Sequence, residues 1–285
     1  MTISQTLKLA VTRLCQGQVD SPRLEAEILL SHVLKKPQEF ILARPECRLT
    51  PKQTTNFKLL ISGRFKGSPV AYLIGHKEFY GLDFFVNKNV LIPRPETELM
   101  VGEALRLIAR STKPATLVDV GTGSGCVAVT LAKLTKQKFM AIDISPLALA
   151  VARRNAKYHK VNKQIKFIQG NLLEPLFNNK FVIRNCKLII LANLPYLTPS
   201  QIKNSPSIKR EPKLALDAGP DGLKYYRQLF KQIKKLRVTG YALCEIGPRQ
   251  SNAIKKLVKR QLPQVKLQIK KDLAGLNRLA IIKIT

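Results

Sequence analysis

The stretch Val-Asp-Val-Gly-Thr-Gly-Ser-Gly at residues 118–125 decides the fold class of this chain. Residues 116–120 predict a short buried strand, residues 126–134 predict a helix, and the glycines form the turn between them. Glycine allows a tight turn and a close approach of the backbone to a ligand. The spacing is G-x-G-x-G and not G-x-G-x-x-G, so the fingerprint of dinucleotide-binding domains is not met. We therefore expect a strand–loop–helix unit of an α/β domain that holds a different ligand.

From about residue 94 onward, helices and strands alternate, which is typical of a doubly wound sheet. Helices are predicted over residues 96–110, 126–134, 147–159, 222–236 and 250–261. Strands are predicted over residues 116–120, 139–143, 165–169, 187–192, 240–245, 265–269 and 278–284. The last two strands predict an antiparallel hairpin at the sheet edge, unlike a pure dinucleotide-binding fold. We expect residues 94–285 to form one Rossmann-like α/β domain.

The N-terminal part of the chain has a different pattern. Residues 1–75 predict a small helical domain, in which Ser21-Pro22 and Thr50-Pro51 each place a hydroxyl N-cap before a proline at the first helical position. This domain is a candidate substrate-recognition module. Residues 76–93 are aromatic and β-prone around a glycine, which predicts a β-hairpin linker between the two domains.

The composition excludes several classes of protein. A chain of 285 residues with 45% hydrophobic residues has room for one large α/β domain and a smaller one. No apolar run approaches the roughly 20 residues of a membrane span, and the first residues lack the pattern of a secretory signal. The five cysteines are scattered and odd in number, which is typical of reduced cytosolic thiols: Cys15, Cys47, Cys126, Cys186 and Cys244. We expect a cytoplasmic protein without membrane contact or a metal site.

The formal net charge of +31 is unusual and rises toward the C-terminus. Residues 1–90 contain 13 basic and 7 acidic residues, whereas residues 201–285 contain 20 and 5. One interpretation is a surface for RNA or for the ribosome, which long-range attraction would favour. The other is a set of solvated helix faces, since no aromatic residues interleave with the basic ones as stacking platforms require. The sequence leaves both interpretations open.

Polar residues at the ends of the predicted strands indicate the ligand of the glycine loop. Asp119 precedes the loop, where a carboxylate would repel a pyrophosphate but can accept a hydrogen bond from an ammonium group. Asp143 lies 22 residues beyond Gly121, at the end of the next strand, and is placed to accept both hydroxyls of a ribose. Asn171 follows the third strand and can contact an adenine edge, while Leu172 can cover its face. A nucleoside that carries an amino acid is S-adenosylmethionine, which we predict as the cofactor.

The motif Asn193-Leu194-Pro195-Tyr196 follows the apolar strand at residues 187–192. Ligands of open α/β sheets bind at the carboxyl ends of the strands. Asn193 offers a carboxamide acceptor and an NH2 donor, Pro195 stiffens the backbone and leaves the preceding carbonyl free of helix pairing, and Tyr196 supplies a flat face. Such a corner can hold a planar group that bears an NH2 and direct its nitrogen at an electrophile.

These motifs resemble those of the HemK/PrmC family of protein-(glutamine-N5) methyltransferases, which modify peptide chain release factors. The resemblance covers nearly the whole chain, and its most specific segments are residues 20–27, 69–75, 90–98 and 210–217 with Gly222-Leu223. It implies a class I methyltransferase sheet and cofactor contacts at Gly121, Thr122, Gly123, Ser124, Gly125, Asp143, Asn171, Leu172 and Asn193. The substrate clamp of the family, usually Asn-Pro-Pro-Tyr, corresponds to Asn193, Leu194, Pro195 and Tyr196.

The resemblance implies transfer of a methyl group from S-adenosylmethionine to a glutamine of a class 1 release factor, with Asn193, Pro195 and Tyr196 as the catalytic residues. Two positions depart from the family pattern. Leu194 replaces the first proline, a form also familiar from adenine dimethyltransferases, and Asn171 stands where an acidic residue is common. The alternative function is therefore an adenine-N6 methyltransferase acting on RNA or DNA. A third hypothesis, a ribosome-binding protein without activity, is disfavoured by the intact set of cofactor residues.

Two further features have two interpretations each. Arg94 and Glu96 either border the active site or form a loop ion pair and a helix N-terminal carboxylate. Glu211 either lines the substrate channel or pairs with its basic neighbours Arg210 and Lys213.

Overall fold

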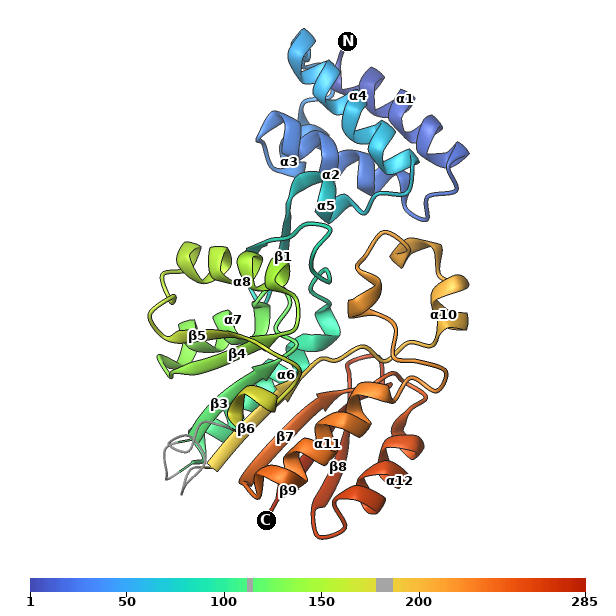
Figure 1. Cartoon of the computed structure of the whole chain (residues 1–285). Coiled ribbons are helices and arrows are strands. Elements are labelled where there is room, and N and C mark those ends of the chain that lie inside the picture. Colours follow the sequence, from blue (N-terminus) through green and yellow to red (C-terminus); the bar gives the residue numbers. More distant parts are fainter. Residues whose placement is uncertain (112–114, 178–186) are drawn as a thin grey trace. The chain divides into compact units, whose positions relative to one another are not determined.

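The computed structural model describes residues 1–111, 115–177 and 187–285, which form two compact units (Figure 1). The first unit holds Met1–His76 together with Pro206–Arg210, and the second holds Lys77–Ser205 and Glu211–Thr285. Cys186 lies outside the described residues, and the other cysteines of the chain are free thiols. The two units are described separately below.

The first unit is helical and packs around its own apolar core. Its α-helices are α1 (Ile3–Gln16), α2 (Pro22–Leu34), α3 (Gln38–Ala43), α4 (Pro51–Phe65) and α5 (Val70–Ile74). The core residues recur at helical spacing, and those buried most deeply include Ile3, Leu14, Leu29, Leu30, Ile41 and Phe57. The short segment Pro206–Arg210 joins this unit, where the Arg210 side chain donates a 2.8 Å hydrogen bond to the carbonyl of Lys66.

The two predicted helix starts of this unit behave differently. Thr50 forms a capping box with Gln53 ahead of Pro51, as expected. Ser21 precedes Pro22 in the same way but makes no side-chain cap hydrogen bond, so the hydroxyl cap predicted there is wrong. The reason is local: Ser21 has φ −129° and ψ 65°, outside the extended conformation in which Thr50 directs its hydroxyl to the free N–H groups.

The hairpin predicted over residues 76–93 is formed by β1 (His76–Phe79) and β2 (Leu82–Phe85). Its residues from Lys77 onward group with the second unit, because Phe79 and Phe84 are buried in the core of that unit. The buried Asn155 holds the hairpin in place: its carboxamide exchanges two hydrogen bonds with the backbone of Phe85 and donates a third to the carbonyl of Ser124. One side chain therefore connects the hairpin to the glycine loop.

The second unit contains a seven-stranded sheet in the order β5-β4-β3-β6-β7-β9-β8. The strands are β3 (Ala115–Val120), β4 (Phe139–Asp143), β5 (Ile165–Gln169), β6 (Lys187–Ala192), β7 (Thr239–Glu245), β8 (Lys266–Lys271) and β9 (Asn277–Ile284). The pairs β3–β4, β4–β5, β3–β6 and β6–β7 are parallel, and β9 is antiparallel to both β7 and β8. The Rossmann-like sheet with an antiparallel hairpin at its edge is confirmed. Within that hairpin β8 is the outermost strand and β9 lies between β7 and β8.

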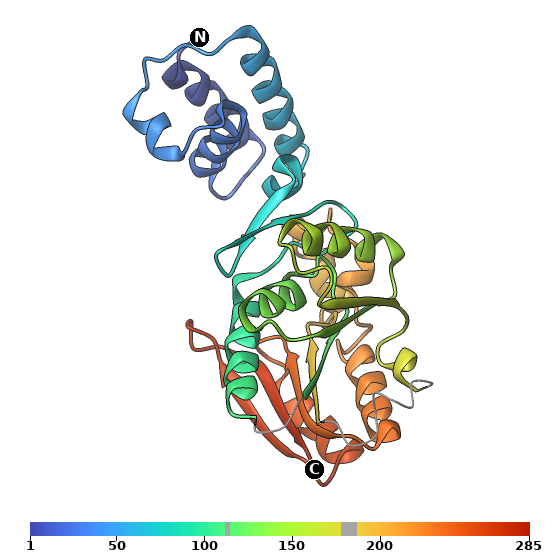
Figure 2. The same cartoon turned by 90° about the vertical axis from the view of Figure 1, so that its left-hand side faces the viewer.

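Helices cover both faces of this sheet. The core on one face is formed with α6 (Glu98–Ala109), α7 (Cys126–Thr135) and α8 (Pro146–Tyr158), and the core on the other with α11 (Lys224–Leu236) and α12 (Ser251–Gln261). Figure 2 shows α6 and α11 on opposite sides of the strands. Neighbouring strand residues such as Leu117 and Val118 face different cores, which explains why these strands are apolar throughout.

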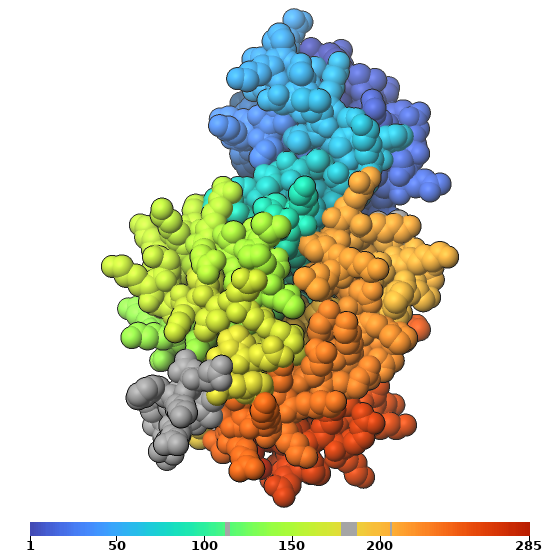
Figure 3. Space-filling model, in the orientation of Figure 1, coloured from blue at the N-terminus to red at the C-terminus, as the bar shows by residue number. Residues whose placement is uncertain are grey.

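On the face of the sheet that α11 and α12 cover, the segment that follows β5 packs directly against α11. Leu172, Leu173 and Leu176, which follow β5, share a core with the α11 residues Leu229 and Phe230. In the space-filling view the yellow segment that follows β5 adjoins the orange segment of α11 (Figure 3). The predicted ends of β4, β5 and β6 coincide with the observed ends, and those of the other predicted elements of this unit differ by at most two residues. Of the helices in the described ranges, none has the length and apolar character that a membrane crossing demands.

Two glycines of the second unit provide a matched test of this packing. Gly240 lies in β7, an interior strand of the sheet, with φ +131°, and a Cβ there would lie 2.0 Å from the carbonyl oxygen of Leu188 on β6. Gly102 is exposed on α6, where an added Cβ meets nothing within 4 Å. We expect Gly240→Ala to lower the free energy of unfolding by roughly 3 kcal/mol or more, through backbone strain and overpacking. Gly102→Ala should raise it by about 0.5–1 kcal/mol through helix propensity.

Urea unfolding of the two variants and the wild type, followed by circular dichroism, measures both effects. Equal unfolding midpoints for the two variants would contradict the observed register of β6 and β7.

Candidate active site

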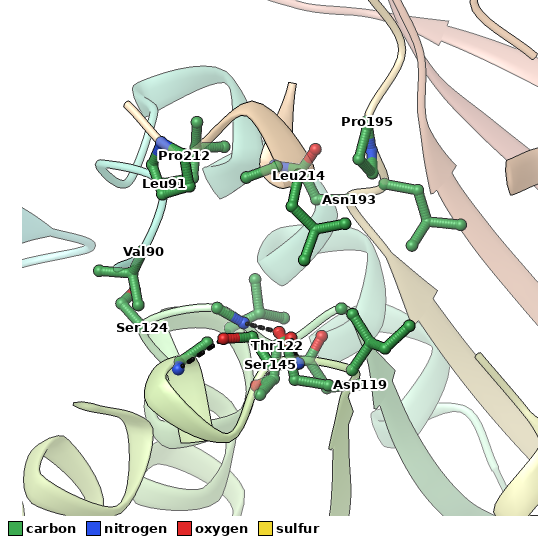
Figure 4. Close-up of a pocket in the computed structure, with 18 of the residues that line it drawn as sticks. Val90, Leu91, Asp119, Thr122, Ser124, Ser145, Asn193, Pro195, Pro212 and Leu214 are labelled. Atoms are coloured by element: carbon green, nitrogen blue, oxygen red, sulfur yellow. Dashed lines mark hydrogen bonds between the residues drawn. The ribbon is translucent and has the colours of Figure 1, made fainter. Parts of the chain in front are cut away.

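A cavity of about 160 Å³ lies at the carboxyl ends of β3, β4 and β6 in the second unit (Figure 4). In Figure 4, Asp119 and Thr122 lie on one side of this cavity, and Asn193, Leu214 and Pro212 lie across it. Of the residues predicted from the sequence, it is lined by Asp119, Gly121, Thr122, Gly123, Ser124, Asp143, Asn171, Leu172, Asn193, Leu194 and Pro195. Gly125 and Tyr196 do not line it.

The glycine loop forms the first wall. Gly121 has φ +72°, and its N–H donates a 2.8 Å hydrogen bond to the carbonyl of Ile142 on the neighbouring strand β4. The loop closes through a 2.8 Å hydrogen bond from the N–H of Gly125 to the carbonyl of Thr122. The glycine at position 125 allows α8 to pack closely against the loop, because a Cβ at this position would lie 3.1 Å from the Cβ of Ala152 on α8. The loop thus brings backbone against the cavity with little side-chain bulk.

Asp143 at the end of β4 is tied to the same loop. Its Oδ2 accepts a 2.8 Å hydrogen bond from the N–H of Gly123, and its Oδ1 accepts one of 2.9 Å from the N–H of Ser145. Burial raises the pKa of this carboxyl group, while these backbone hydrogen bonds favour its ionised form. Because each carboxylate oxygen retains a further lone pair, Asp143 can accept two hydroxyl groups from a ligand.

Asp119 lies deeper, at the end of β3. It is 3% exposed, and its Oδ2 accepts a 2.6 Å hydrogen bond from the hydroxyl of Thr122. Burial raises the pKa of Asp119 to about 6, against the opposing hydrogen bonds from Thr122 and the backbone of Ala128. An ammonium group bound in the cavity would stabilise the ionised form.

Asn171 and Leu172 lie on the cavity wall after β5. The Asn171 carboxamide donates a 2.8 Å hydrogen bond to Glu174, which leaves its carbonyl oxygen and one N–H for a ligand. Leu172 is buried with φ +55° and lines the cavity. The adenine contacts predicted for these two residues fit this placement and stay predictions.

Asn193 follows β6 and has one defined side-chain partner. Its Nδ2 donates a 3.0 Å hydrogen bond to the hydroxyl of Thr97, which in turn donates a 2.6 Å hydrogen bond to the carboxylate of Glu245. Within the described ranges, the structure shows no donor to the carboxamide oxygen of Asn193. That oxygen is therefore available to a ligand, and the hydrogen bond of the amide nitrogen to Thr97 fixes the orientation of the carboxamide.

The other members of the Asn-Leu-Pro-Tyr corner divide into two groups. Leu194 is 3% exposed and packs on the glycine loop, where a Cβ added to Gly121 would lie 3.1 Å from its Cδ2. Pro195 lines the cavity. Tyr196 is instead packed against the core beside Gly247, and burial raises the pKa of its hydroxyl to about 12. The aromatic ring of Tyr196, which we predicted to pack against the substrate amide, therefore does not line the cavity.

A second layer of hydrogen bonds braces this corner. The Gln250 side chain donates to the carbonyls of Tyr196 at 3.0 Å and of Gly222 at 3.1 Å. Leu197 exchanges backbone hydrogen bonds with the segment around Asp217, accepting from Ala218 at 2.8 Å and donating to Leu216 at 3.1 Å. The end of the sequence motif, at Leu216 and Asp217, thus abuts the corner.

Thr97 and Glu245 were not predicted as site residues. Thr97 is 1% exposed at the start of α6, and Glu245 is 2% exposed at the end of β7. Burial raises the pKa of Glu245 to about 7. The sequence did contain one signal for Glu245, namely a carboxylate at the end of a largely apolar strand, as Asp143 is.

Arg94 and Glu211, for which the sequence left two interpretations each, form a pair with each other. Arg94 lines the cavity and forms an ion pair with Glu211, whose other oxygen accepts a 3.1 Å hydrogen bond from the N–H of Ile92. Glu211 pairs with neither Arg210 nor Lys213, and Lys213 instead lies 3.9 Å from Asp217. Glu211 therefore holds the segment 90–94 against the cavity. No group of three or more His, Cys, Asp or Glu residues in the described ranges could hold a metal ion.

Comparison with known proteins gives consistent matches in both parts of the chain. The model of the PrmC N-terminal domain matches residues 5–75, and that of ribosomal protein L11 methyltransferase (PrmA) matches residues 96–205. The chain is 40% identical over 282 residues to the release factor glutamine methyltransferase of Moorella thermoacetica, which covers 98% of this chain and 97% of the relative. It is 33% identical over 290 residues to the enzyme of the same name from Bacillus anthracis, with 100% of both chains covered.

A solved structure supports the fold. The N-terminal domain of human METTL16, determined in complex with SAH, is similar with a TM-score of 0.54 and 15% identity, and the match covers 90% of this chain and 93% of the other. A likeness at this identity concerns the fold alone. The class I methyltransferase fold expected from the sequence is confirmed.

The buried Asp119 predicts a pH dependence of stability. Its pKa is higher in the folded protein than in the unfolded chain, so the folded state binds more protons and stability falls as pH rises from about 4 to 6. Asp119→Asn removes this titration. We expect the free energy of unfolding of the wild type to fall by roughly 2 kcal/mol relative to the variant between pH 4 and pH 6. Urea unfolding of both proteins at the two pH values measures it, and a constant difference would show that Asp119 titrates normally.

Proposed function

The chain belongs to the release factor glutamine methyltransferase family, and from this premise we propose that it methylates the side-chain nitrogen (N5) of a glutamine in a class 1 peptide chain release factor, with S-adenosylmethionine as the methyl donor. The observation that carries this proposal is the position of Asn193. Its carboxamide oxygen is available at the cavity while its amide nitrogen is engaged by Thr97.

The residues around the cavity fit S-adenosylmethionine. Asp143 would hold the ribose hydroxyls, Asp119 lies where it can stabilise an ammonium group, and Leu172 would cover the adenine. The glycine loop lines the cavity with little side-chain bulk, which suits close contact between its backbone and the ligand. The cofactor supplies an electrophilic methyl group on a sulfonium sulfur. The protein supplies binding, orientation and exclusion of water.

The substrate amide needs two hydrogen-bond acceptors, because an NH2 group has two hydrogens to direct. Asn193 Oδ1 is one acceptor. The carbonyl of Leu194 or of Pro195 is the other, since neither accepts a hydrogen bond from any residue that the structure describes. With both hydrogens held in the amide plane, the face of the nitrogen is turned toward the methyl donor. Orientation of this kind can contribute several kcal/mol to lowering the barrier.

This arrangement requires no side chain to remove a proton before transfer. The amide nitrogen is a poor nucleophile because its lone pair is delocalised into its carbonyl group, so alignment and desolvation are the protein's main contributions. The methylated nitrogen carries an extra proton after transfer and loses it to water. The buried carboxylates of Asp119 and Glu245 fit this scheme, because they accept hydrogen bonds from the hydroxyls of Thr122 and Thr97. They are not needed to take a proton from the substrate amide.

The alternative substrate is an adenine of RNA or DNA, whose exocyclic NH2 would suit the same two acceptors. A flipped base also requires an aromatic side chain that stacks on it. Among the described residues that line the cavity, Tyr225 is the only aromatic one, and Tyr196 is packed against the core. Tyr225 is thus a single candidate for stacking, and the family of the chain favours the amide substrate.

The basic surface is a further part of the proposal. Exposed lysines on α11 and α12, among them Lys234, Lys255, Lys256 and Lys259, give the second unit a strong positive field. We propose that this surface contacts RNA, which would bring the enzyme close to release factors at the ribosome. The methyl transfer itself does not depend on this contact.

Replacing the clamp residue separates chemistry from binding. Asn193→Ala should lower kcat for methyl transfer to a purified release factor by about 100-fold or more, because one acceptor of the substrate amide is lost. The affinity for S-adenosylmethionine, measured by calorimetry, should change by no more than a few-fold. Asn252→Ala, at an exposed position of α12, is the matched control and should match the wild type. Turnover of Asn193→Ala within tenfold of the wild type would refute the clamp.

The substrate class is tested directly with tritiated S-adenosylmethionine. We expect label to enter a purified class 1 release factor and to be lost when its acceptor glutamine is replaced. Ribosomal RNA, incubated in parallel, should remain unlabelled. Label in adenine of the RNA and none in the protein would establish the alternative function.

A further inference from the structure

Three side chains from separate elements form one hydrogen-bonded line that ends at the cavity. Asn193 Nδ2 donates to Thr97 Oγ1 at 3.0 Å, and Thr97 Oγ1 donates to Glu245 Oε2 at 2.6 Å. Thr97 is 1% exposed and Glu245 is 2% exposed, whereas Asn193 lines the cavity. We call this line the Asn193–Thr97–Glu245 relay.

The relay has a defined polarity, because a hydroxyl group has only one hydrogen to donate. An ionised Glu245 accepts hydrogen bonds and donates none, so Thr97 must direct its hydrogen to the carboxylate. Thr97 then has only lone pairs to offer to Asn193. The carboxamide of Asn193 must therefore turn its NH2 toward Thr97 and its oxygen in another direction.

Protonation of Glu245 removes this restriction. A neutral carboxylic acid can donate to Thr97 Oγ1, which frees the Thr97 hydrogen to bond the oxygen of Asn193. The carboxamide can then rotate by half a turn and present its NH2 group to the cavity. A donor at that point would repel the NH2 group of a substrate amide.

We propose that Glu245 is a positioning residue for methyl transfer, and that through Thr97 it holds the Asn193 carboxamide with its oxygen toward the substrate. This inference rests on the proposed function, since it assigns the polarity that an amide substrate requires. Glu245 touches no reacting atom in this scheme. The charge state of Glu245 determines whether the oxygen or the NH2 group of the Asn193 side chain faces the substrate.

The surroundings of Glu245 set the conditions for this control. Burial opposes the ionised form, Arg278 on β9 and Arg94 before α6 favour it, and Glu96 opposes it. Nearby Tyr196, Tyr226 and Cys126 all have raised pKa values and stay neutral near pH 7. The backbone carbonyl of Glu245 accepts a hydrogen bond from the hydroxyl of Tyr226, so the strand end is held in place.

Removal of the Thr97 hydroxyl tests the relay with little change in side-chain volume. Thr97→Val should lower kcat for release-factor methylation by about tenfold or more, while the affinity for S-adenosylmethionine stays within a few-fold of the wild type. Thr97→Ser retains the hydroxyl and should recover kcat to within about threefold of the wild type. Thr130→Val is the matched control, because the Thr130 hydroxyl is buried in α7 without a partner. Equal kcat values for Thr97→Val and Thr130→Val would overturn the proposal.

The pH profile separates positioning from packing. In the wild type, kcat should fall as pH decreases through about 7, because Glu245 becomes protonated and the Asn193 carboxamide is no longer held. In Thr97→Val the residual kcat should no longer show this step, since Glu245 and Asn193 are uncoupled. The same step in both proteins would overturn the proposal.

A measurement without turnover distinguishes failure of this inference from failure of the proposed function. The side-chain NH2 signals of Asn193 in a ¹H–¹⁵N spectrum are identified by their absence in Asn193→Ala. They should shift with a midpoint near pH 7 in the wild type and in Thr97→Ser, but not in Thr97→Val. If these shifts occur while the wild type fails to methylate a release factor, the relay stands and the substrate assignment fails. If the side-chain NH2 signals of Asn193 do not change with pH in the wild type, the relay itself is overturned.

Discussion

The contact between Leu194 and the glycine loop joins the two halves of the site. Leu194 lies so close to Gly121 that a Cβ there would be 3.1 Å from the leucine methyl group. The contact exists because β3 and β6 are adjacent and parallel, so that both chains leave the sheet at the same edge. A methyl donor held by one loop and an amide held by the other would thus be neighbours. The departure of this chain from the usual Asn-Pro-Pro-Tyr motif falls at this contact, and leucine fills it with an apolar side chain.

Buried carboxylates are the second constraint, and they oppose stability at neutral pH. Asp143 and Glu245 end their strands and Asp119 is the penultimate residue of β3, and burial raises the pKa of each. An acid whose pKa is raised by folding makes the folded state less stable as pH increases. Carboxyl groups with perturbed pKa values cluster at functional sites. Their partners here are the hydroxyls of Thr122 and Thr97 and the N–H groups of Gly123 and Ser145, all of which shape the cavity wall.

Acidic and basic side chains are distributed differently between the interior and the surface of the protein. Glu27, Glu103, Asp119, Asp143, Glu211 and Glu245 are buried, whereas Arg278 is the only lysine or arginine that is buried within the described ranges. The solvent-facing surface is therefore even more positive than the formal charge of +31 suggests. A field of this strength would raise the local concentration of any anionic partner and would weaken with added salt.

The α/β class, the order and approximate limits of the elements, and the part of the site carried by local motifs could all be predicted from the amino-acid sequence. The glycine loop, Asp143 and Asn193 were found because each lies at the end of its own apolar strand, and parallel strands present these ends at one edge. The tertiary structure alone decided which distant side chains meet. Thr97 is 96 residues from Asn193 and 148 from Glu245, and Glu211 is 117 residues from Arg94, so no local pattern pairs them. It also decided that Tyr196 turns to the core and that Phe79 and Phe84 join the sheet unit, because burial of a side chain depends on the elements that cover it and not on its neighbours in the chain.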